Sequence, residues 1–259
     1  MKKRRTRGVA VFAGVIAVAA LAGCMTAAHR ECTCRCGRCA CCEAEPVCTD
    51  EELAEGFVPL FDGKTMANWV VPESGCYRVA AGGVMEYRPE LGGGGLWTER
   101  EYGDFCLRFD FRLTSDCNNG LAVRCPKDNL NTYTGGFEVQ IVDDESTAIG
   151  EVLPQLGLRQ QPYQRHGAVY GVVPPRVRED GRSFLNPVGR WNRQEVWMKG
   201  SRLKVVLNGS VIQDVDLDAC PTEGLDHAAH PGIRSRRGCL GWLSHGYPCF
   251  WKRIRIKEL

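Results

Sequence analysis

The sequence predicts an all-β fold for residues 56–259, a two-sheet antiparallel jelly-roll sandwich of the concanavalin A-like, laminin G-like kind. Three observations support this: short segments alternate apolar and polar residues, glycine-rich turns separate them, and no segment shows a long helical period. The chain has 259 residues, of which 44% are hydrophobic and 25% charged. This composition is typical of a globular protein and argues against full-length disorder or a polytopic membrane protein.

The N-terminus has the layout of a secretory signal. Residues 2–7 are basic, and the uncharged apolar run that follows, 9–22, is shorter than the roughly 20 residues that cross a bilayer. The run ends in Leu-Ala-Gly before Cys24, which resembles the bacterial lipoprotein signal, cut before a cysteine that then carries lipid. We therefore expect 1–23 to be a signal peptide and Cys24 to be lipidated. The protein would be exported and anchored at the cell envelope, periplasmic or at the surface; an ordinary signal peptide or signal anchor is the alternative.

Removing residues 1–23 changes the charge of the protein. This segment holds five basic residues and no acidic one, so the formal net charge changes from +2 to −3. A mildly acidic protein offers no electrostatic reason to bind nucleic acid. The sequence therefore predicts no nucleic-acid partner and a membrane contact made through the N-terminal lipid.

Residues 24–55 form a cysteine-rich linker. Seven cysteines lie within residues 32–48, with almost no other apolar side chain beside them. Disulfides in an oxidising compartment are one interpretation, and a thiolate metal cluster is the other. Apart from Cys24, seven cysteines lie in this linker and seven in the rest of the chain. Because both numbers are odd, complete pairing would require a disulfide between linker and domain.

The clearest strand patterns follow in chain order. Residues 105–112 and 137–141 alternate apolar with polar side chains, and 202–207 precede Asn-Gly, which favours a type I′ hairpin turn. The last strand, 250–259, is expected to direct its isoleucines inward and Arg253, Arg255 and Lys257 outward. Between the strands, the irregular polar segment 145–166, which ends in His166, is typical of a binding loop.

Seven motifs occur in order along the domain. They are GFVPLFDGK (56–64), WTEREYGDF (97–105), NNGLAVR (118–124), GFEVQIVDD (136–144), GAVYGVVPP (167–175), GRWN (189–192) and RIRIKEL (253–259). Together they resemble the 3-keto-disaccharide hydrolase family over the whole of residues 56–259. The resemblance implies a jelly-roll enzyme that acts on carbohydrates oxidised at C3.

A 3-keto sugar is cleaved by elimination. The ketone acidifies the proton on C2, a base removes it, and the enolate expels the C1 oxygen before water adds back. Such a site needs a base, a positive or metal centre for the enolate oxygen, and a proton donor for the leaving group. The paired carboxylates of ordinary glycosidases are not required.

The predicted site lies along one strand and its ends. Glu138 and Gln140 face away from the apolar side of their strand, and Asp143 follows it. We expect Glu138, Asp143 and His245 to be catalytic and, as one option, to ligate a divalent metal ion. The predicted substrate-binding residues are Arg124, Gln140, Asn119, Tyr170, Trp97 and His166. Structural alternatives remain: a Glu138–Arg124 ion pair, turns at Asn119 and His245, and core positions for the aromatic residues.

The chain departs from the family pattern near its end. Members carry Leu-Gln-x-His, whereas this chain has Leu243 in the glutamine position and keeps His245. The loss of this polar group favours an alternative function, a non-catalytic carbohydrate-binding module at the cell surface. A third hypothesis makes the cysteine-rich linker a metal-binding or redox segment.

Overall fold

The computed structural model describes residues 45–145 and 160–259. The predicted signal peptide, Cys24 and residues 32–44 of the cysteine-rich linker lie outside the described residues, as does most of the polar segment 145–166. None of the helices in the described part has the length and apolarity needed to cross a membrane.

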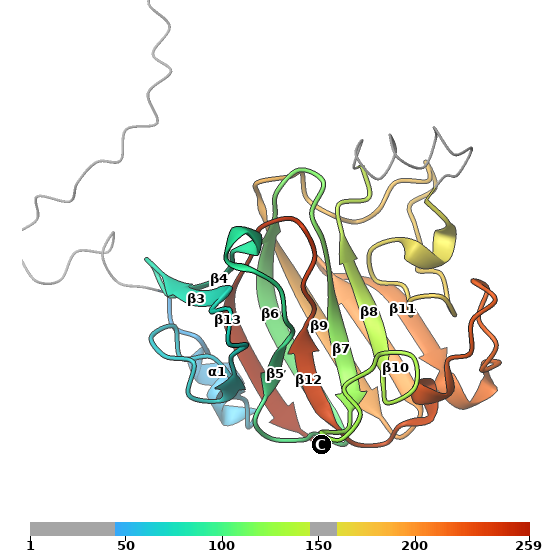
Figure 1. Ribbon diagram of the computed structural model, residues 1–259, viewed down its shortest axis with the longest axis horizontal. Helices are drawn as coiled ribbons and strands as arrows, with labels where there is room; N and C mark the ends of the chain where they lie inside the picture. The colour runs from blue at the N-terminus through green and yellow to red at the C-terminus, as the bar shows by residue number, and fades with distance from the viewer. Residues whose placement is uncertain (1–44, 146–159) are drawn as a thin grey trace, which may run out of the picture. The chain divides into compact units, whose positions relative to one another are not determined.

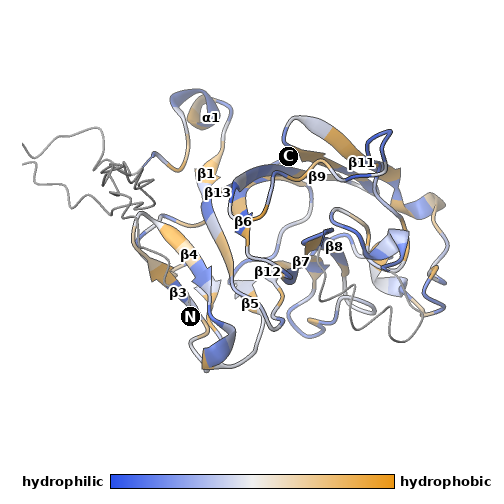
Figure 2. Cartoon of the chain, turned by 90° about the horizontal axis from the view of Figure 1, so that it is seen from above, coloured by the Kyte–Doolittle hydropathy of each residue, from blue (hydrophilic) through white to orange (hydrophobic). Residues whose placement is uncertain are grey.

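The predicted all-β jelly-roll sandwich is confirmed, with two antiparallel sheets packed face to face (Figures 1 and 2). The larger sheet has the order β11-β10-β9-β6-β13-β4-β3, with β1 also paired to β13, and the smaller has the order β2-β5-β12-β7-β8. The larger sheet comprises β1 (Val58–Pro59), β3 (Tyr77–Ala80), β4 (Val84–Tyr87), β6 (Phe105–Leu113), β9 (Trp191–Lys199), β10 (Arg202–Leu207), β11 (Ser210–Asp216) and β13 (Cys249–Glu258). The smaller comprises β2 (Trp69–Val70), β5 (Leu96–Thr98), β7 (Asn118–Cys125), β8 (Phe137–Val142) and β12 (Cys239–Trp242).

Helices are few and short in the described residues. They are α1 (Asp50–Ala54) and the 3-10 helices η1 (Pro89–Leu91), η2 (Pro162–Gln164), η3 (Leu217–Ala219) and η4 (Pro231–Arg234). The Asn-Gly hairpin is confirmed, because Asn208 and Gly209 join β10 to β11 with φ values of 50° and 83°. Positive φ at both central residues is what a type I′ turn requires.

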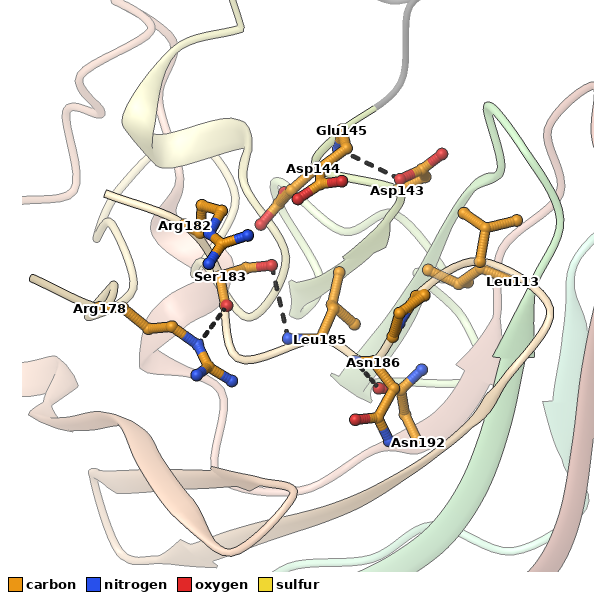
Figure 3. A pocket seen from close by; sticks show the side chains of 12 residues that line it. Leu113, Asp143, Asp144, Glu145, Arg178, Arg182, Ser183, Leu185, Asn186 and Asn192 are labelled. Carbon is orange, nitrogen blue, oxygen red and sulfur yellow. Dashed lines mark hydrogen bonds between the residues drawn. The ribbon is translucent and has the colours of Figure 1, made fainter. Parts of the chain in front are cut away.

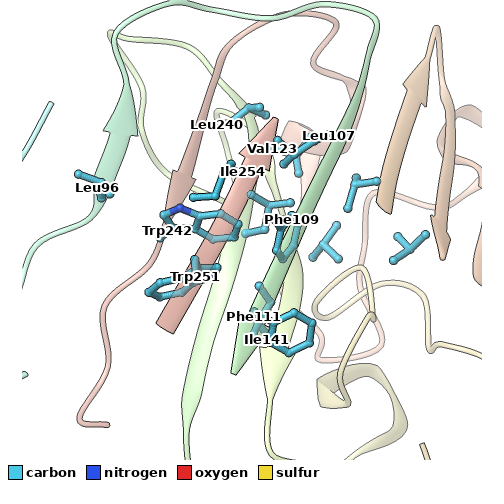
Figure 4. Close-up of a cluster of buried hydrophobic side chains, with 14 of the residues drawn as sticks. Leu96, Leu107, Phe109, Phe111, Val123, Ile141, Leu240, Trp242, Trp251 and Ile254 are labelled. Atoms are coloured by element: carbon cyan, nitrogen blue, oxygen red, sulfur yellow. The ribbon is translucent and has the colours of Figure 1, made fainter. Parts of the chain in front are cut away.

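The core fills the space between the sheets and is rich in aromatic rings (Figure 4). Trp242 of β12 stacks on Trp251 of β13 at 4.9 Å, and Phe109 of β6 meets the edge of Trp242 at 4.9 Å. All three side chains are fully buried. Each such side chain contributes about 1.5–3 kcal/mol by burial, so the inward faces of the alternating strands hold the layers together.

The outer face of the larger sheet carries a buried ion pair that the sequence did not predict. Arg255 points outward from β13, as expected, yet it is only 1% exposed because α1 covers it. Its guanidinium donates to both carboxylate oxygens of Glu52, at 2.6 and 2.9 Å. Residues assigned to the linker therefore pack on the domain, and the folded unit begins before Gly56.

We expect Glu52→Ala to lower the free energy of unfolding by about 3 kcal/mol, because it leaves Arg255 buried without its partner. Burial acts to raise the pKa of Glu52, but hydrogen bonds from Arg255 and the Thr49 N–H lower it to about 2. The stabilisation is therefore complete above the unfolded-state pKa and is lost as the pH falls toward 2. Urea unfolding at pH 7 and pH 3 measures both effects. Equal stability of variant and wild type at pH 7 would contradict the assignment.

Candidate functional site

A row of four residues crosses the outer face of the smaller sheet, which faces the viewer in Figure 1. The register aligns Trp97 of β5 with Gly241 of β12, Gly241 with Ala122 of β7, and Ala122 with Glu138 of β8. Strands lie about 4.8 Å apart, so the row spans about 14 Å between the backbones of Trp97 and Glu138. The row begins with an aromatic residue and ends with an acidic one, and the two residues between them are small.

Glu138 is the most unusual group in this row. The residue is 8% exposed, and no hydrogen bond or ion pair is formed by its carboxyl group with any described residue. Burial alone raises the pKa of Glu138 to about 8. A buried carboxyl without a compensating partner costs folding free energy, and such groups concentrate at functional sites.

Gly120 makes room for this carboxyl group. A Cβ atom at Gly120 would lie 2.1 Å from Oε1 of Glu138, so the acid occupies the space that any side chain would fill. Leu243 lies on the other side of Gly120 and donates its N–H to the Gly120 carbonyl at 2.9 Å. The position that is glutamine in the family pattern is thus adjacent to Gly120, and leucine there offers the acid no hydrogen bond.

Tyrosines flank Glu138 at the edge of the sheet. Tyr170 donates its N–H to the Glu138 carbonyl at 3.0 Å, and its ring meets that of Tyr133 edge-on at 6.5 Å. Burial raises the pKa of Tyr133 to about 12, helped by the nearby Tyr170, Asp226 and Glu138. Tyr133 is therefore a neutral phenol, able to donate a hydrogen bond, within electrostatic reach of the acid.

A pair formed by buried His230 and partly exposed Asp226 lies against Tyr133. The His230 ring stacks on Tyr133 at 4.5 Å and contacts the Asp226 carboxylate through Nε2 at 3.0 Å. Gly171 and Gly224 leave space for this pair. A Cβ atom at either glycine would lie 2.4–2.5 Å from a polar side-chain atom of the pair. The pair fixes the position of the Tyr133 ring.

Sequence reasoning missed Tyr133, Asp226 and His230. They lie on two connecting segments, 126–136 and 220–230, that show no strand alternation and join the site only through long-range packing. Of the predicted substrate-binding residues, Tyr170 lies beside Glu138 at the edge of the sheet, and two others share the strand face of Glu138. They are Trp97, which covers Gly241, and Gln140, whose Oε1 accepts the Ile141 N–H at 3.0 Å.

Two other predicted substrate-binding residues face the core. Asn119 is fully buried and points inward with Leu121, and its Oδ1 accepts the Gly120 N–H. His166 lies between the sheets, stacked on Phe111 at 5.2 Å and bonded to Gln194 at 2.9 Å. Burial lowers the pKa of His166 to about 4, so it is a neutral core residue and the prediction of substrate contact is wrong.

Arg124 also has a different role from the predicted one. Its φ is 54°, and the side chain is fully buried. The guanidinium donates to the carbonyls of Gly103 and Gly200 and pairs with Asp104 at 2.9 Å. It therefore ties loops together and does not pair with Glu138, so both predictions for Arg124 are corrected.

The three predicted metal ligands do not form a cluster. Across the described ranges, no three His, Cys, Asp or Glu side chains are arranged to hold a metal ion. The Asp143 carboxylate instead accepts the N–H groups of Asp116 and Glu145 at 3.1 Å, and His245 lies exposed between β12 and β13. The residues present thus do not fit a metal at Glu138, Asp143 and His245.

A polar pocket of about 330 Å³ lies at the end of the sandwich (Figure 3). Its wall combines Asp143 and Asp144 with Arg178, Arg182 and Asn192. Burial raises the pKa of Asp144 to about 6, although the His166 N–H and Arg165 act to lower it. The pocket has the size and hydrogen-bonding groups to hold a sugar ring. The carboxylates of Asp143 and Asp144 accept backbone hydrogen bonds, whereas the carboxyl group of Glu138 has no such partner among the described residues.

Comparisons with known proteins agree with this architecture. Two proteins of Parabacteroides distasonis ATCC 8503, provisionally described as glycosyl hydrolases, have solved structures that share the fold. One gives a TM-score of 0.68 at 23% identity over 82% of this chain and 98% of its own. The other gives 0.63 at 24% identity over 78% and 99%.

A search of curated proteins found no match. The model of the 3-keto-alpha-glucoside-1,2-lyase-like domain matches residues 56–257, which is most of the chain and contains the whole row from Trp97 to Glu138. The protein is therefore a carbohydrate-active member of the 3-keto-alpha-glucoside-1,2-lyase-like domain family.

Proposed function

We propose that this protein is an exported, lipid-anchored enzyme that cleaves 3-keto-glycosides by elimination followed by hydration. The family membership supports the substrate class, and the signal-like N-terminus ending at Cys24 supports export. The observation that carries the proposal is Glu138, a buried acid without a partner whose pKa lies near 8. A base with a pKa near the working pH transfers protons most effectively.

In the proposed reaction Glu138 is the base. Its carboxylate takes the proton from C2, and the C–H electron pair forms the enolate with the C3 carbonyl. Return of that electron pair restores the ketone, forms the C1=C2 double bond and breaks the bond from C1 to the leaving oxygen. Water then adds its hydroxyl group to C1, and protonated Glu138 returns a proton to C2. The other proton of the water passes to the departed oxygen, which is released as the alcohol.

The neutral phenol of Tyr133 is the proposed hydrogen-bond donor to the substrate oxygen on which negative charge develops. Its raised pKa keeps the proton on the phenol, so it can hydrogen-bond an enolate or a leaving oxygen without adding negative charge. The Trp97 ring, which covers Gly241 in the same row, supports stacking on a sugar face.

The decisive experiment is a turnover assay of the full chain with a 3-keto-β-glucoside. We expect release of the leaving alcohol together with the free 3-keto sugar. Binding of 3-keto-glycosides and unmodified glycosides alike, without product, would overturn the proposal.

We expect Tyr133→Phe to lower kcat about 100-fold, the usual effect of removing one donor from a developing oxyanion. The phenyl ring keeps the stack on His230, so the melting temperature should stay near that of the wild type. Tyr102→Phe is the matched control, since Tyr102 pairs with Gly238 in another part of the fold. Equal loss of kcat in both variants would refute a specific role for Tyr133.

A second candidate function is a carbohydrate-binding module without turnover. Leu243 beside Gly120 and the polar end pocket favour it, because they combine a less polar acid site with a sugar-sized cavity. In that case Asp144→Asn would weaken glycan binding, and Glu138→Gln would leave it unchanged. Calorimetric titration of both variants with intact and 3-keto glycosides distinguishes the two functions.

A further inference from the structure

Three buried thiols surround Tyr87 in the core. Cys249 is the register partner of Tyr87 across β4 and β13, and Cys76 and Cys117 both interact electrostatically with its phenol. All three cysteines are fully buried. The proposed reaction uses none of them.

Two of these thiols are brought together by the backbone. Cys249 pairs with Leu113 at the end of β6, and the following residue, Thr114, bridges the two segments. Its Oγ1 donates to the Pro248 carbonyl at 2.9 Å, while its own carbonyl accepts the Cys117 N–H at 3.2 Å. The Cys117 thiol is near enough to the Cys249 thiol to interact with it electrostatically.

The third thiol has a different partner. The Cys76 Sγ donates to the Gly94 carbonyl at 3.8 Å. Cys76 is therefore an internal control for the oxidation of Cys117 and Cys249.

We propose that Cys117 and Cys249 form a disulfide in the mature protein, linking the two sheets of the sandwich. Cys117 immediately precedes β7 of the smaller sheet, and Cys249 begins β13 of the larger one. The cross-link closes a long loop of chain, from residue 117 to residue 249, and such loops gain the most from closure.

The oxidant is a low-molecular-weight disulfide such as glutathione disulfide. One thiolate attacks it to give a mixed disulfide and one glutathione, and the second cysteine displaces the other glutathione. The two cysteine protons pass to the two glutathione thiolates, and the two electrons reduce one glutathione disulfide to two glutathione molecules.

Burial of the Cys249 thiol determines at which stage of folding the disulfide can form. Desolvation raises the pKa of the Cys249 thiol well above its ordinary value, so little thiolate exists once the sheets have closed. The cross-link therefore forms during folding, and the reduced folded protein oxidises slowly.

The test begins with the full chain, reduced and unfolded, then refolded in a glutathione redox buffer. Remaining thiols are blocked, and the digest is analysed by mass spectrometry without reduction. We expect a peptide that joins Cys117 to Cys249. Blocked thiols at both positions, or a bond from either one to Cys76, would overturn the assignment.

Two serine variants provide a second measurement. Reductant should lower the melting temperature of Cys76→Ser as much as that of the wild type. In Cys117→Ser the fall should be smaller by roughly 10 °C, because this cross-link is already absent. An equal fall in both variants would refute the cross-link, and the peptide map of the wild type applies even if a variant fails to fold.

Discussion

Replacing Glu138 by Gln is expected to lower kcat about 1,000-fold while making the protein more stable at pH 7. The amide cannot take a proton, and loss of a general base lowers kcat by about 1,000-fold. The same change removes an ionisable group from a place where its charge has no partner. Activity and stability therefore move in opposite directions, as is typical when a strained functional group is replaced.

The pKa of Glu138 predicts how the stability gain depends on pH. The folded-state pKa of about 8 lies above the ordinary value of 4.5, so the folded protein holds one extra proton between these values. Ionisation of Glu138 in the unfolded chain therefore lowers the stability of the wild type progressively as the pH rises from 4.5 to 8. The cost is about 3 kcal/mol at pH 7, of which burial of the uncharged amide offsets about 1 kcal/mol.

Urea unfolding of wild type and Glu138→Gln at pH 4, 7 and 8.5 measures this difference. At pH 4 the variant should be about 1 kcal/mol less stable than the wild type, because only the cost of the buried amide remains, and at pH 7 and 8.5 it should be more stable. Glu73→Gln is the matched control, because Glu73 is exposed and should show no difference at any pH. In the wild type, kcat/KM should rise toward pH 8 as Glu138 ionises. A variant that is less stable than the wild type at pH 8.5 would show that the acid has a stabilising partner.

The strands could be predicted from the sequence because alternation is a local property. β6, β8 and the β10–β11 hairpin have the expected places, and Glu138 and Gln140 face away from the core as predicted. The same alternation places Asn119 with Leu121 and Val123 on the inward face, so the period argues against its use as a substrate ligand.

Other side-chain positions could not be predicted, because they depend on contacts between residues that are far apart in the sequence. Arg124 has a positive φ where β7 shifts register against β12, and its side chain bonds to the loops at Gly103 and Gly200. Tyr133 and His230 come together from segments almost 100 residues apart. Arg255 is covered by a helix from the segment assigned to the linker. Long-range packing decides each of these positions.

Gly120→Ala is expected to remove most of the activity while leaving the fold intact. The added methyl group would lie 2.1 Å from Oε1 and 2.6 Å from Cδ of Glu138, so the carboxyl group must move. The three closest atoms all belong to the Glu138 side chain and none to backbone, so the side chain can shift while the strands keep their positions. Displacing a catalytic group by about 1 Å can lower the rate about 100-fold.

The measurement compares kcat and the melting temperature of Gly120→Ala with those of Gly103→Ala. Gly103 is the matched control because the nearest obstacle to its added methyl group, the Arg236 carbonyl oxygen, would lie 3.6 Å away, which is an ordinary contact. We expect kcat to fall about 100-fold in the first variant only, with both melting temperatures near that of the wild type. Unchanged kcat in Gly120→Ala would mean that the position of the Glu138 carboxyl group is not what limits turnover. Because this variant retains the acid, it separates the geometry of the base from its presence, which Glu138→Gln alone cannot do.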